Sequence, residues 1–274
     1  MTLQDKLKKL REERKAILAA NFYNLETLQA ALRAASHEGV PIILQLSESS
    51  IRYIGLELAA KMARAAIEAW KVEAWLHLDH GGSLELVRRC LDAGFDSVMI
   101  DASEKALEEN IRISREAVKM AAKYGANVEA ELGYIAKLHQ KQSVESGFTR
   151  PDDALRFAEE TGVSALAVSI GTAHGFYREE PKLDIELLGR IREKVETPLV
   201  LHGSSGVPDE AILAAIRNGI TKINLATEIK NAFMKKLKSG LMATDEIDLR
   251  IVFPKATDAA CELIQNKLRL ITHA

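Results

Sequence analysis

Eight short aliphatic runs alternate with longer segments of helical period along this chain. The runs lie at residues 16–22, 41–47, 72–79, 97–102, 127–133, 165–170, 198–203 and 220–226. Because they are apolar at nearly every position, they fit parallel strands that are covered on both faces. The amphipathic segments between them lie at residues 25–37, 51–70, 84–93, 106–124, 152–161, 185–195 and 209–218. Eight such units predict an α/β fold of the (β/α)8 TIM barrel type.

The chain has 274 residues, whereas such a barrel needs about 250. We therefore expect a single domain over residues 1–274, with extra helices at the C-terminus. The formal net charge is −2 and no face-forming block of Lys and Arg is present, which argues against a nucleic-acid partner.

No stretch of the sequence approaches the roughly 18 apolar residues that a membrane span needs. Residues 1–15 are charged throughout and lack the apolar core of a secretory signal, so we expect a cytoplasmic protein with no membrane partner. Cys90 and Cys261 are far apart and outside any CxxC spacing. We expect both to be buried as small apolar residues rather than to form a disulfide or a thiolate metal site.

Polar side chains occur at the carboxyl ends of the predicted strands. They are Asn21, Ser47, Asp79, His80, Asp101, Glu131, His174, His202 and Asn224. In a TIM barrel these ends form the concave face that carries catalytic groups. Histidines that only fill a core have no reason to choose one end, so this distribution predicts an active site.

Three of these residues, His80, His174 and His202, each end or follow a strand and precede glycine. Three neutral imidazoles with an open fourth position are typical of a catalytic Zn²⁺ site, although Co²⁺ or Fe²⁺ also fits such ligands. Asp79 adjoins His80, and strand alternation points the two apart unless the strand is ending there, as the following glycines indicate. The alternative role for Asp79 is to cap the next helix.

Two carboxylates, Glu129 and Glu131, share one face of the fifth predicted strand. Charges inside a parallel barrel are costly unless they are paired or bind a metal, which favours a functional role for at least one. Lys222 lies on the eighth predicted strand, where a salt-bridge or phosphate partner is commoner than a nucleophile. His77 sits within the third predicted strand and is interpreted as a packed side chain or as one that contacts a metal ligand from behind.

Glycine-bearing turns follow the sixth and seventh predicted strands, at Gly175 and at residues 203–206, and residues 224–227 close the eighth. This part of a TIM barrel frequently binds phosphate through backbone N–H groups and a helix N-terminus. Ser205 and Thr227 serve equally well as helix caps, and capping does not exclude phosphate binding.

These residues together resemble the class II metal-dependent fructose/tagatose-bisphosphate aldolase family over almost the whole chain. The resemblance rests on residues 20–24, 77–80, 101–103, 128–133, 171–175, 201–203 and 222–227. It implies that His80, His174 and His202 bind the catalytic metal, with Asp101 and Glu131 near an alternative metal position. It further implies that Asp79 is the general acid/base and that Asn224 steadies the enediolate.

The same resemblance implies a substrate-binding set and a structural monovalent cation near the phosphate. The set consists of Asn21, Ser47, Gly175, Arg178, Gly203, Ser204, Ser205, Asn224, Ala226 and Thr227. The implied activity is reversible aldol cleavage of a ketose 1,6-bisphosphate to dihydroxyacetone phosphate and glyceraldehyde 3-phosphate, by a homodimer or homotetramer. The alternatives are a related lyase on another ketose 1-phosphate and a metal-binding assembly subunit with little turnover.

Three segments bear on the finer assignment. The form Asn-x-Ala-Thr at residues 224–227 resembles the tagatose type more than the form with Asp at the third position, without fixing the sugar. The family's Gly-Gly pair and acidic cluster are missing after Gly133, so Glu145 is the expected proton shuttle, with His139 as the alternative. The tail after Gly240 also differs, and it leaves Arg250 as the candidate for the distal phosphate.

Overall fold

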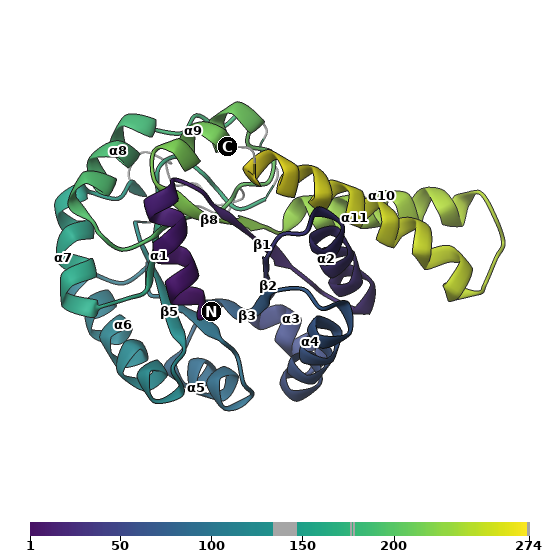
Figure 1. Ribbon diagram of the computed structural model, residues 1–274, viewed down its shortest axis with the longest axis horizontal. Coiled ribbons are helices and arrows are strands. Elements are labelled where there is room, and N and C mark those ends of the chain that lie inside the picture. Colours follow the sequence, from purple (N-terminus) through teal and green to yellow (C-terminus); the bar gives the residue numbers. More distant parts are fainter. Residues whose placement is uncertain (134–146, 176, 178, 273–274) are drawn as a thin grey trace.

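The computed structural model describes residues 1–133, 147–175, 177 and 179–272, and its strands form a closed parallel barrel (Figure 1). The strands are β1 (Ile17–Asn21), β2 (Ile42–Ser47), β3 (Ala74–Gly81), β4 (Ser97–Ile100), β5 (Asn127–Leu132), β6 (Ala165–Val168), β7 (Leu199–Leu201) and β8 (Ile220–Leu225). Each strand pairs with the next in the chain, and β8 closes on β1. The predicted TIM barrel is confirmed, with every strand end within two residues of its predicted place.

Helices follow the strands and surround the barrel. They are α2 (Leu25–Glu38), α3 (Glu48–Ile54), α4 (Leu56–Trp70), α5 (Leu84–Asp92), α6 (Leu107–Ala121), α7 (Pro151–Thr161), α8 (Ile185–Lys194) and α9 (Asp209–Arg217). The predicted helix over residues 51–70 is wrong as a single element, because Gly55 has a φ of 92° and separates α3 from α4. No helix in the described ranges is long and apolar enough to cross a membrane.

An N-terminal helix that the sequence analysis did not predict, α1 (Leu3–Glu13), lies against one end of the barrel. Its buried leucines Leu3, Leu7 and Leu10 form one cluster with Ile43 and Trp75. The spacing of these leucines is that of one helix face, which is the signal that identifies the helix. Apolar packing therefore fills this end of the barrel, and the polar strand ends lie at the other.

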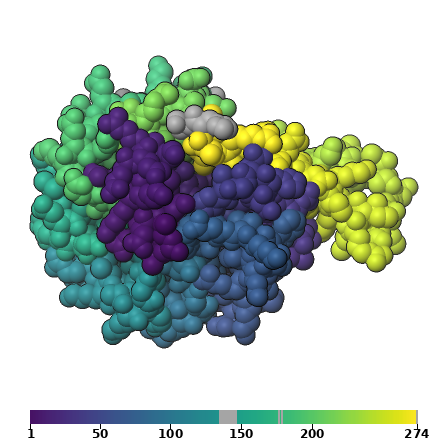
Figure 2. Space-filling model, viewed as in Figure 1, coloured from purple at the N-terminus to yellow at the C-terminus, as the bar shows by residue number. Residues whose placement is uncertain are grey.

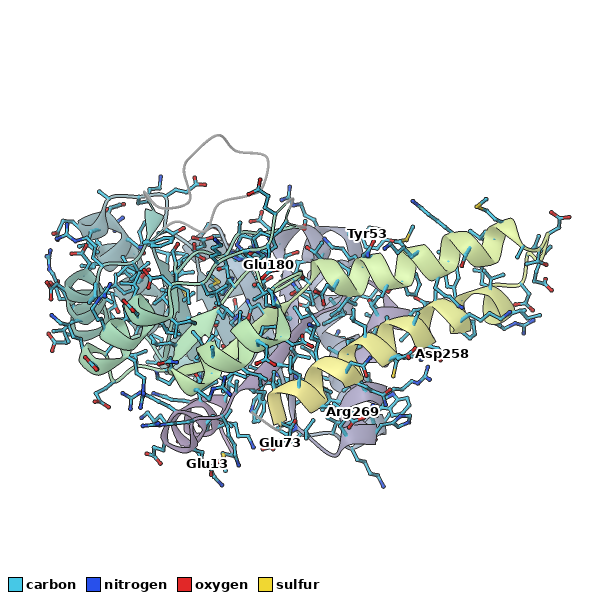
Figure 3. The ribbon with its side chains drawn as sticks, turned by 90° about the horizontal axis from the view of Figure 1, so that it is seen from above. Glu13, Tyr53, Glu73, Glu180, Asp258 and Arg269 are labelled. Carbon is cyan, nitrogen blue, oxygen red and sulfur yellow. The ribbon has the colours of Figure 1, made fainter. Side chains whose placement is uncertain are left out.

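Residues that follow a strand mark the carboxyl end of the barrel, and residues that precede a strand mark its amino end. Figure 3 shows Tyr53 and Glu180, which follow β2 and β6, on the upper side of the molecule. Glu13 and Glu73, which precede β1 and β3, lie on the lower side. The upper side is consequently the carboxyl-end rim, on which the polar residues singled out from the sequence gather.

The last two helices, α10 (Thr227–Met242) and α11 (Leu249–Thr272), extend sideways from the barrel as an arm (Figures 1 and 2). Near the barrel, α11 is tied to α2 by ion pairs from Arg33 to Asp258 and from Arg269 to Glu38, both 2.8 Å long. The predicted C-terminal helices are thus present. Arg250 lies in the first turn of α11, at the outer end of the arm, and pairs with Asp248. The helix that leads from the barrel to this end, α10, is about 24 Å long.

Both cysteines are buried, and burial raises the pKa of the Cys90 thiol to about 12. Because the thiolate is the reactive form, this shift makes Cys90 a poor nucleophile near neutral pH. We expect Ellman's reagent to react slowly with both cysteines in the folded protein and rapidly after denaturation in guanidinium chloride. Full modification of the native protein within seconds would contradict this packing.

Candidate metal centre

Three histidine rings meet at the carboxyl-end rim. The centroid of the His80 ring lies 4.8 Å from that of the His174 ring and 4.7 Å from that of the His202 ring. Glu131, at the end of β5, joins them, because one ligand atom from each of the four residues lies within 4.8 Å of the others. Histidine nitrogens and carboxylate oxygens are donors that catalytic zinc sites use, so these residues fit a divalent metal.

The third strand reaches this cluster through an irregularity that the sequence analysis did not foresee. It does not end at Asp79 but continues to Gly81, and its register with β4 shifts between Leu78 and Gly81. His80 lies in the left-handed region at a φ of 50°. The resulting bulge breaks the alternation of side chains, so that Asp79 and His80 both line the same cavity.

Two carboxylates determine which nitrogens point inward. Asp101 Oδ2 lies 2.7 Å from His80 Nδ1, and Glu129 Oε1 lies 2.7 Å from His202 Nε2. Because a carboxylate accepts hydrogen bonds, each of these nitrogens carries the proton. The remaining two nitrogens, His80 Nε2 and His202 Nδ1, are 2.9 Å apart and face each other.

The two histidines differ in charge. Burial opposes protonation of His80, but Asp79 and Asp101 outweigh it and raise the pKa of His80 to about 9. Burial lowers the pKa of His202 well below its usual value, and the charges of His80 and Lys222 add to the effect. In the protein without metal, His80 is therefore protonated at pH 7 and donates to neutral His202, and metal binding displaces that proton.

The predicted metal carboxylates separate in space. Glu131 belongs to the histidine cluster. Asp101 instead stands behind His80, where its Oδ1 accepts from Ser103 N at 3.1 Å and Oγ at 2.8 Å. Asp101 thus orients a candidate ligand in this structure, an arrangement typical of the outer sphere of metal sites.

Asp79 is held in a chain of amides rather than at a helix cap, since Ser83 caps α5. Asn21 Nδ2 donates to Asp79 Oδ2 at 2.8 Å, and Gln45 Nε2 donates to Asn21 Oδ1 at 2.7 Å. Burial opposes ionisation of Asp79, but the His80 charge and the Asn21 amide outweigh it and hold the pKa of Asp79 below its usual value. Asp79 is consequently a carboxylate able to accept a proton.

Two cavities meet at the histidines, and both are lined by His80 and His174. The narrower one, about 50 Å³, also contacts Asn21, Gly175, Gly203, Ser204, Ser205, Asn224, Ala226 and Thr227. The wider one, about 560 Å³, opens toward the ends of β2 and β4 and is lined by residues that include Ser47, Ser103 and Glu131. Ser47 also caps α3 by accepting from Ser50 N.

The glycine turn after β7 packs backbone against backbone. Gly203 has a φ of 66°, and a Cβ there would lie 2.5 Å from Ala173 O, so only glycine fits. Tyr177 joins the two loops, because its hydroxyl accepts from Ala173 N at 2.6 Å and donates to Gly203 O at 2.8 Å. Nothing in the sequence pattern around Tyr177 distinguishes this role. Two predicted site residues, Glu145 and Arg178, lie outside the described residues, as does His139.

The family model for class II fructose-bisphosphate aldolase matches residues 1–274. The chain belongs to this family. Its structure is similar to that of the YdjI aldolase from Escherichia coli K12, with 33% sequence identity, a TM-score of 0.89, and coverage of 98% of this chain and 96% of that one.

Two further solved structures are similar. One is a candidate fructose-1,6-bisphosphate aldolase from Coccidioides immitis, with 31% identity, a TM-score of 0.88, and coverage of 97% of this chain and 94% of that one. The other is the fructose-bisphosphate aldolase of Campylobacter jejuni, with 21% identity, a TM-score of 0.83, and coverage of 98% and 94%. The last likeness supports the fold alone. As a class II aldolase family member, the chain is expected to be a metal-dependent lyase, consistent with its His/Glu cluster.

Replacing His202 by alanine removes an inward-facing nitrogen while leaving the barrel strands intact. We expect bound zinc to fall from one per chain to well below one, as measured by plasma mass spectrometry after dialysis. His37→Ala, which alters an exposed histidine on α2, is the matched control and keeps full zinc content. Undiminished zinc in His202→Ala would rule out this site.

Proposed function

We propose that the chain catalyses reversible, metal-dependent aldol cleavage of a ketose 1,6-bisphosphate of the fructose or tagatose type. The products are dihydroxyacetone phosphate and glyceraldehyde 3-phosphate. The observation that carries this proposal is that His80 and His174 line both a narrow glycine-lined cavity and a wider one, with Asp79 and His202 beside them in the narrow cavity. A substrate that spans both cavities places its middle carbons at the histidines.

The proposed metal is Zn²⁺, with Co²⁺ or Fe²⁺ as alternatives, held by His80, His174 and His202 with Glu131 adjacent. When bound, it supplies Lewis acidity toward the C2 carbonyl and C3 hydroxyl oxygens of the substrate. The assignment of these histidines as ligands is supported by the inward-facing nitrogens of His80 and His202 and by the neutral state of His202.

Asp79 is the proposed base for cleavage. It takes the proton of the C4 hydroxyl, the C3–C4 bond breaks, and its electron pair remains on the dihydroxyacetone phosphate half as an enediolate. Asn21 keeps Asp79 oriented, and Asn224, 3.4 Å from Asp79, steadies the enediolate through its amide. Protonation of the enediolate at the former C3 carbon completes the reaction, and Glu145, or His139 in its place, is the proposed proton donor.

One substrate phosphate is proposed to bind in the narrow cavity. There, Gly175, Gly203 and Ser205 face the beginning of α10, where Ala226 and Thr227 lie at a helix N-terminus that favours anions. Arg178 and a monovalent cation are the further proposed partners of this phosphate. Ser204, whose hydroxyl donates to Asn224 O, fixes the turn, and Ser47 is proposed to contact the far half of the substrate.

A second candidate substrate is another ketose 1-phosphate, whose far end carries hydroxyl groups instead of a phosphate. It is favoured by the wide cavity, whose lining includes the carboxylates of Glu48, Asp101, Glu104 and Glu131 beside Lys105. Carboxylates repel a phosphate dianion but accept hydrogen bonds from hydroxyls.

Asp79→Ala removes the proposed base without removing a metal ligand. We expect kcat for cleavage to fall by about 10²–10⁴-fold while zinc content stays at the wild-type level. Fructose 1,6-bisphosphate, tagatose 1,6-bisphosphate and a ketose 1-phosphate are assayed in parallel, with and without a chelator. Near-normal turnover of Asp79→Ala would assign Asp79 a structural role, and metal-loaded wild type inactive on all three would favour the assembly subunit.

We propose that the chain forms a homodimer or homotetramer in which the arm contacts a second copy. Six of the eleven large apolar side chains exposed among the described residues lie on the arm: Met234, Leu241, Met242, Ile247, Leu249 and Ile251. Such a concentration on a projecting element is typical of an interaction surface. Figure 2 shows that the outer half of the arm stands clear of the barrel.

Charging the arm tip tests this assembly. The variant Met242→Glu/Ile247→Glu places carboxylates at positions that are 89% and 91% exposed in the chain, so folding of the barrel is unaffected. We expect its mass in solution to fall to that of one chain by light scattering. Tyr124→Glu, on an exposed position away from the arm, is the control, and an unchanged mass of the double variant would contradict the proposal.

A further inference from the structure

A layer of titratable side chains lies inside the barrel directly beneath the histidine cluster. Glu129 on β5 is 2% exposed, Lys222 on β8 is 1% exposed, and His77 on β3 is fully buried. The aldol mechanism uses none of them. Burying charge costs free energy unless the charges are paired and hydrogen-bonded, so specific contacts must stabilise these three side chains.

The carboxylate of Glu129 connects the layer to the candidate ligands. Its Oε2 accepts from Lys222 Nζ at 2.8 Å, and its Oε1 accepts from His202 Nε2 at 2.7 Å. Glu129 and Lys222 come from strands that are not neighbours in the barrel, so their ion pair crosses its interior. His77 Nδ1 contacts Ser97 Oγ at 2.8 Å, and its Nε2 lies 3.8 Å from Glu129 Oε2.

A histidine ligand needs its orientation and its tautomer fixed. His202 directs the lone pair of Nδ1 toward His80 Nε2 only if Nδ1 is unprotonated and Nε2 carries the proton. A ring without a fixed hydrogen bond can also adopt the other tautomer or turn over. Glu129 accepts the Nε2 proton, but a carboxylate rotates about its last side-chain bond unless its second oxygen is also held. Lys222 holds that second oxygen.

We propose that the buried Glu129–Lys222 ion pair is the positioning unit of His202, fixing the Nε2–H tautomer so that Nδ1 is presented to the metal. This inference rests on the proposed metal role of His202. Lys222 is a positioning residue, because it reaches the candidate metal ligand only through Glu129.

His80, which is also oriented by a carboxylate, is more exposed to solvent than His202. His80 is held by Asp101 through the opposite ring nitrogen, and the two side chains are 26% and 25% exposed, where water can compensate a lost contact. The corresponding side chains of His202 and Glu129 are 1% and 2% exposed. Loss of the buried pair therefore leaves no solvent to restore the orientation of His202.

Two variants test the proposal. Lys222→Met removes the anchor of Glu129, and Glu129→Gln/Lys222→Met replaces both charges by neutral side chains of similar shape, so that no unpaired charge stays buried. Lys194→Met, which breaks the surface pair with Asp152, is the matched control. Metal affinity is measured with Co²⁺ by chelator competition, and ligand geometry by the visible absorption of bound Co²⁺.

We expect both variants to bind Co²⁺ about 10–100-fold more weakly than wild type, with altered absorption bands, and the control to match wild type. A purely structural role for the pair predicts that the neutral double variant folds and binds Co²⁺ normally. That result, or wild-type binding and spectrum in Lys222→Met, would overturn the proposal. If Lys222→Met does not fold, the double variant decides.

A second measurement needs neither a variant nor a metal. Nitrogen-15 NMR of the metal-free wild-type protein reports the tautomer of His202, which we expect to be Nε2–H. Observation of the Nδ1–H tautomer would overturn the positioning role even if no variant folds. Failure of the wild type to bind Co²⁺, with the Nε2–H tautomer present, would count against the proposed metal-dependent function and leave the role of Glu129–Lys222 in holding the ring intact.

Discussion

The hydrogen-bonded closure of eight parallel strands is the constraint on which the rest of this structure depends. Closure brings every strand's carboxyl end to one rim, so residues more than 120 positions apart, such as His80 and His202, come within hydrogen-bond distance. The opposite end is filled by apolar side chains of α1, β2 and β3. Polar chemistry is thereby confined to the rim and to the layer just beneath it.

Two carboxylates give the histidine cluster its chemical asymmetry. Asp101 holds one nitrogen of His80 and Glu129 holds the opposite nitrogen of His202, so the rings face each other with unlike nitrogens. One ring is protonated and the other neutral before a metal binds, because carboxylates surround His80 while burial and Lys222 act on His202. A metal cation that replaces the proton between His80 Nε2 and His202 Nδ1 would face the lone pairs of both nitrogens.

The strands, the rim residues and the family were predictable from the sequence, because apolar runs and strand-end polar residues are local patterns. The bulge at His80 was not, since it depends on how β3 pairs with β4. The contact of Lys222 with Glu129 joins residues 93 positions apart across the barrel, and a sequence shows only that both are charged. The leucine spacing of α1 was a local signal that the sequence analysis overlooked.

X-ray absorption at the zinc edge tests the central claim most directly, because it reports the atoms around the metal whatever the substrate. The account predicts that zinc-loaded protein shows nitrogen neighbours at about 2.0–2.1 Å with the multiple-scattering signature of three imidazole rings. A spectrum with oxygen neighbours and no imidazole signature would contradict the assignment of His80, His174 and His202 as the metal centre.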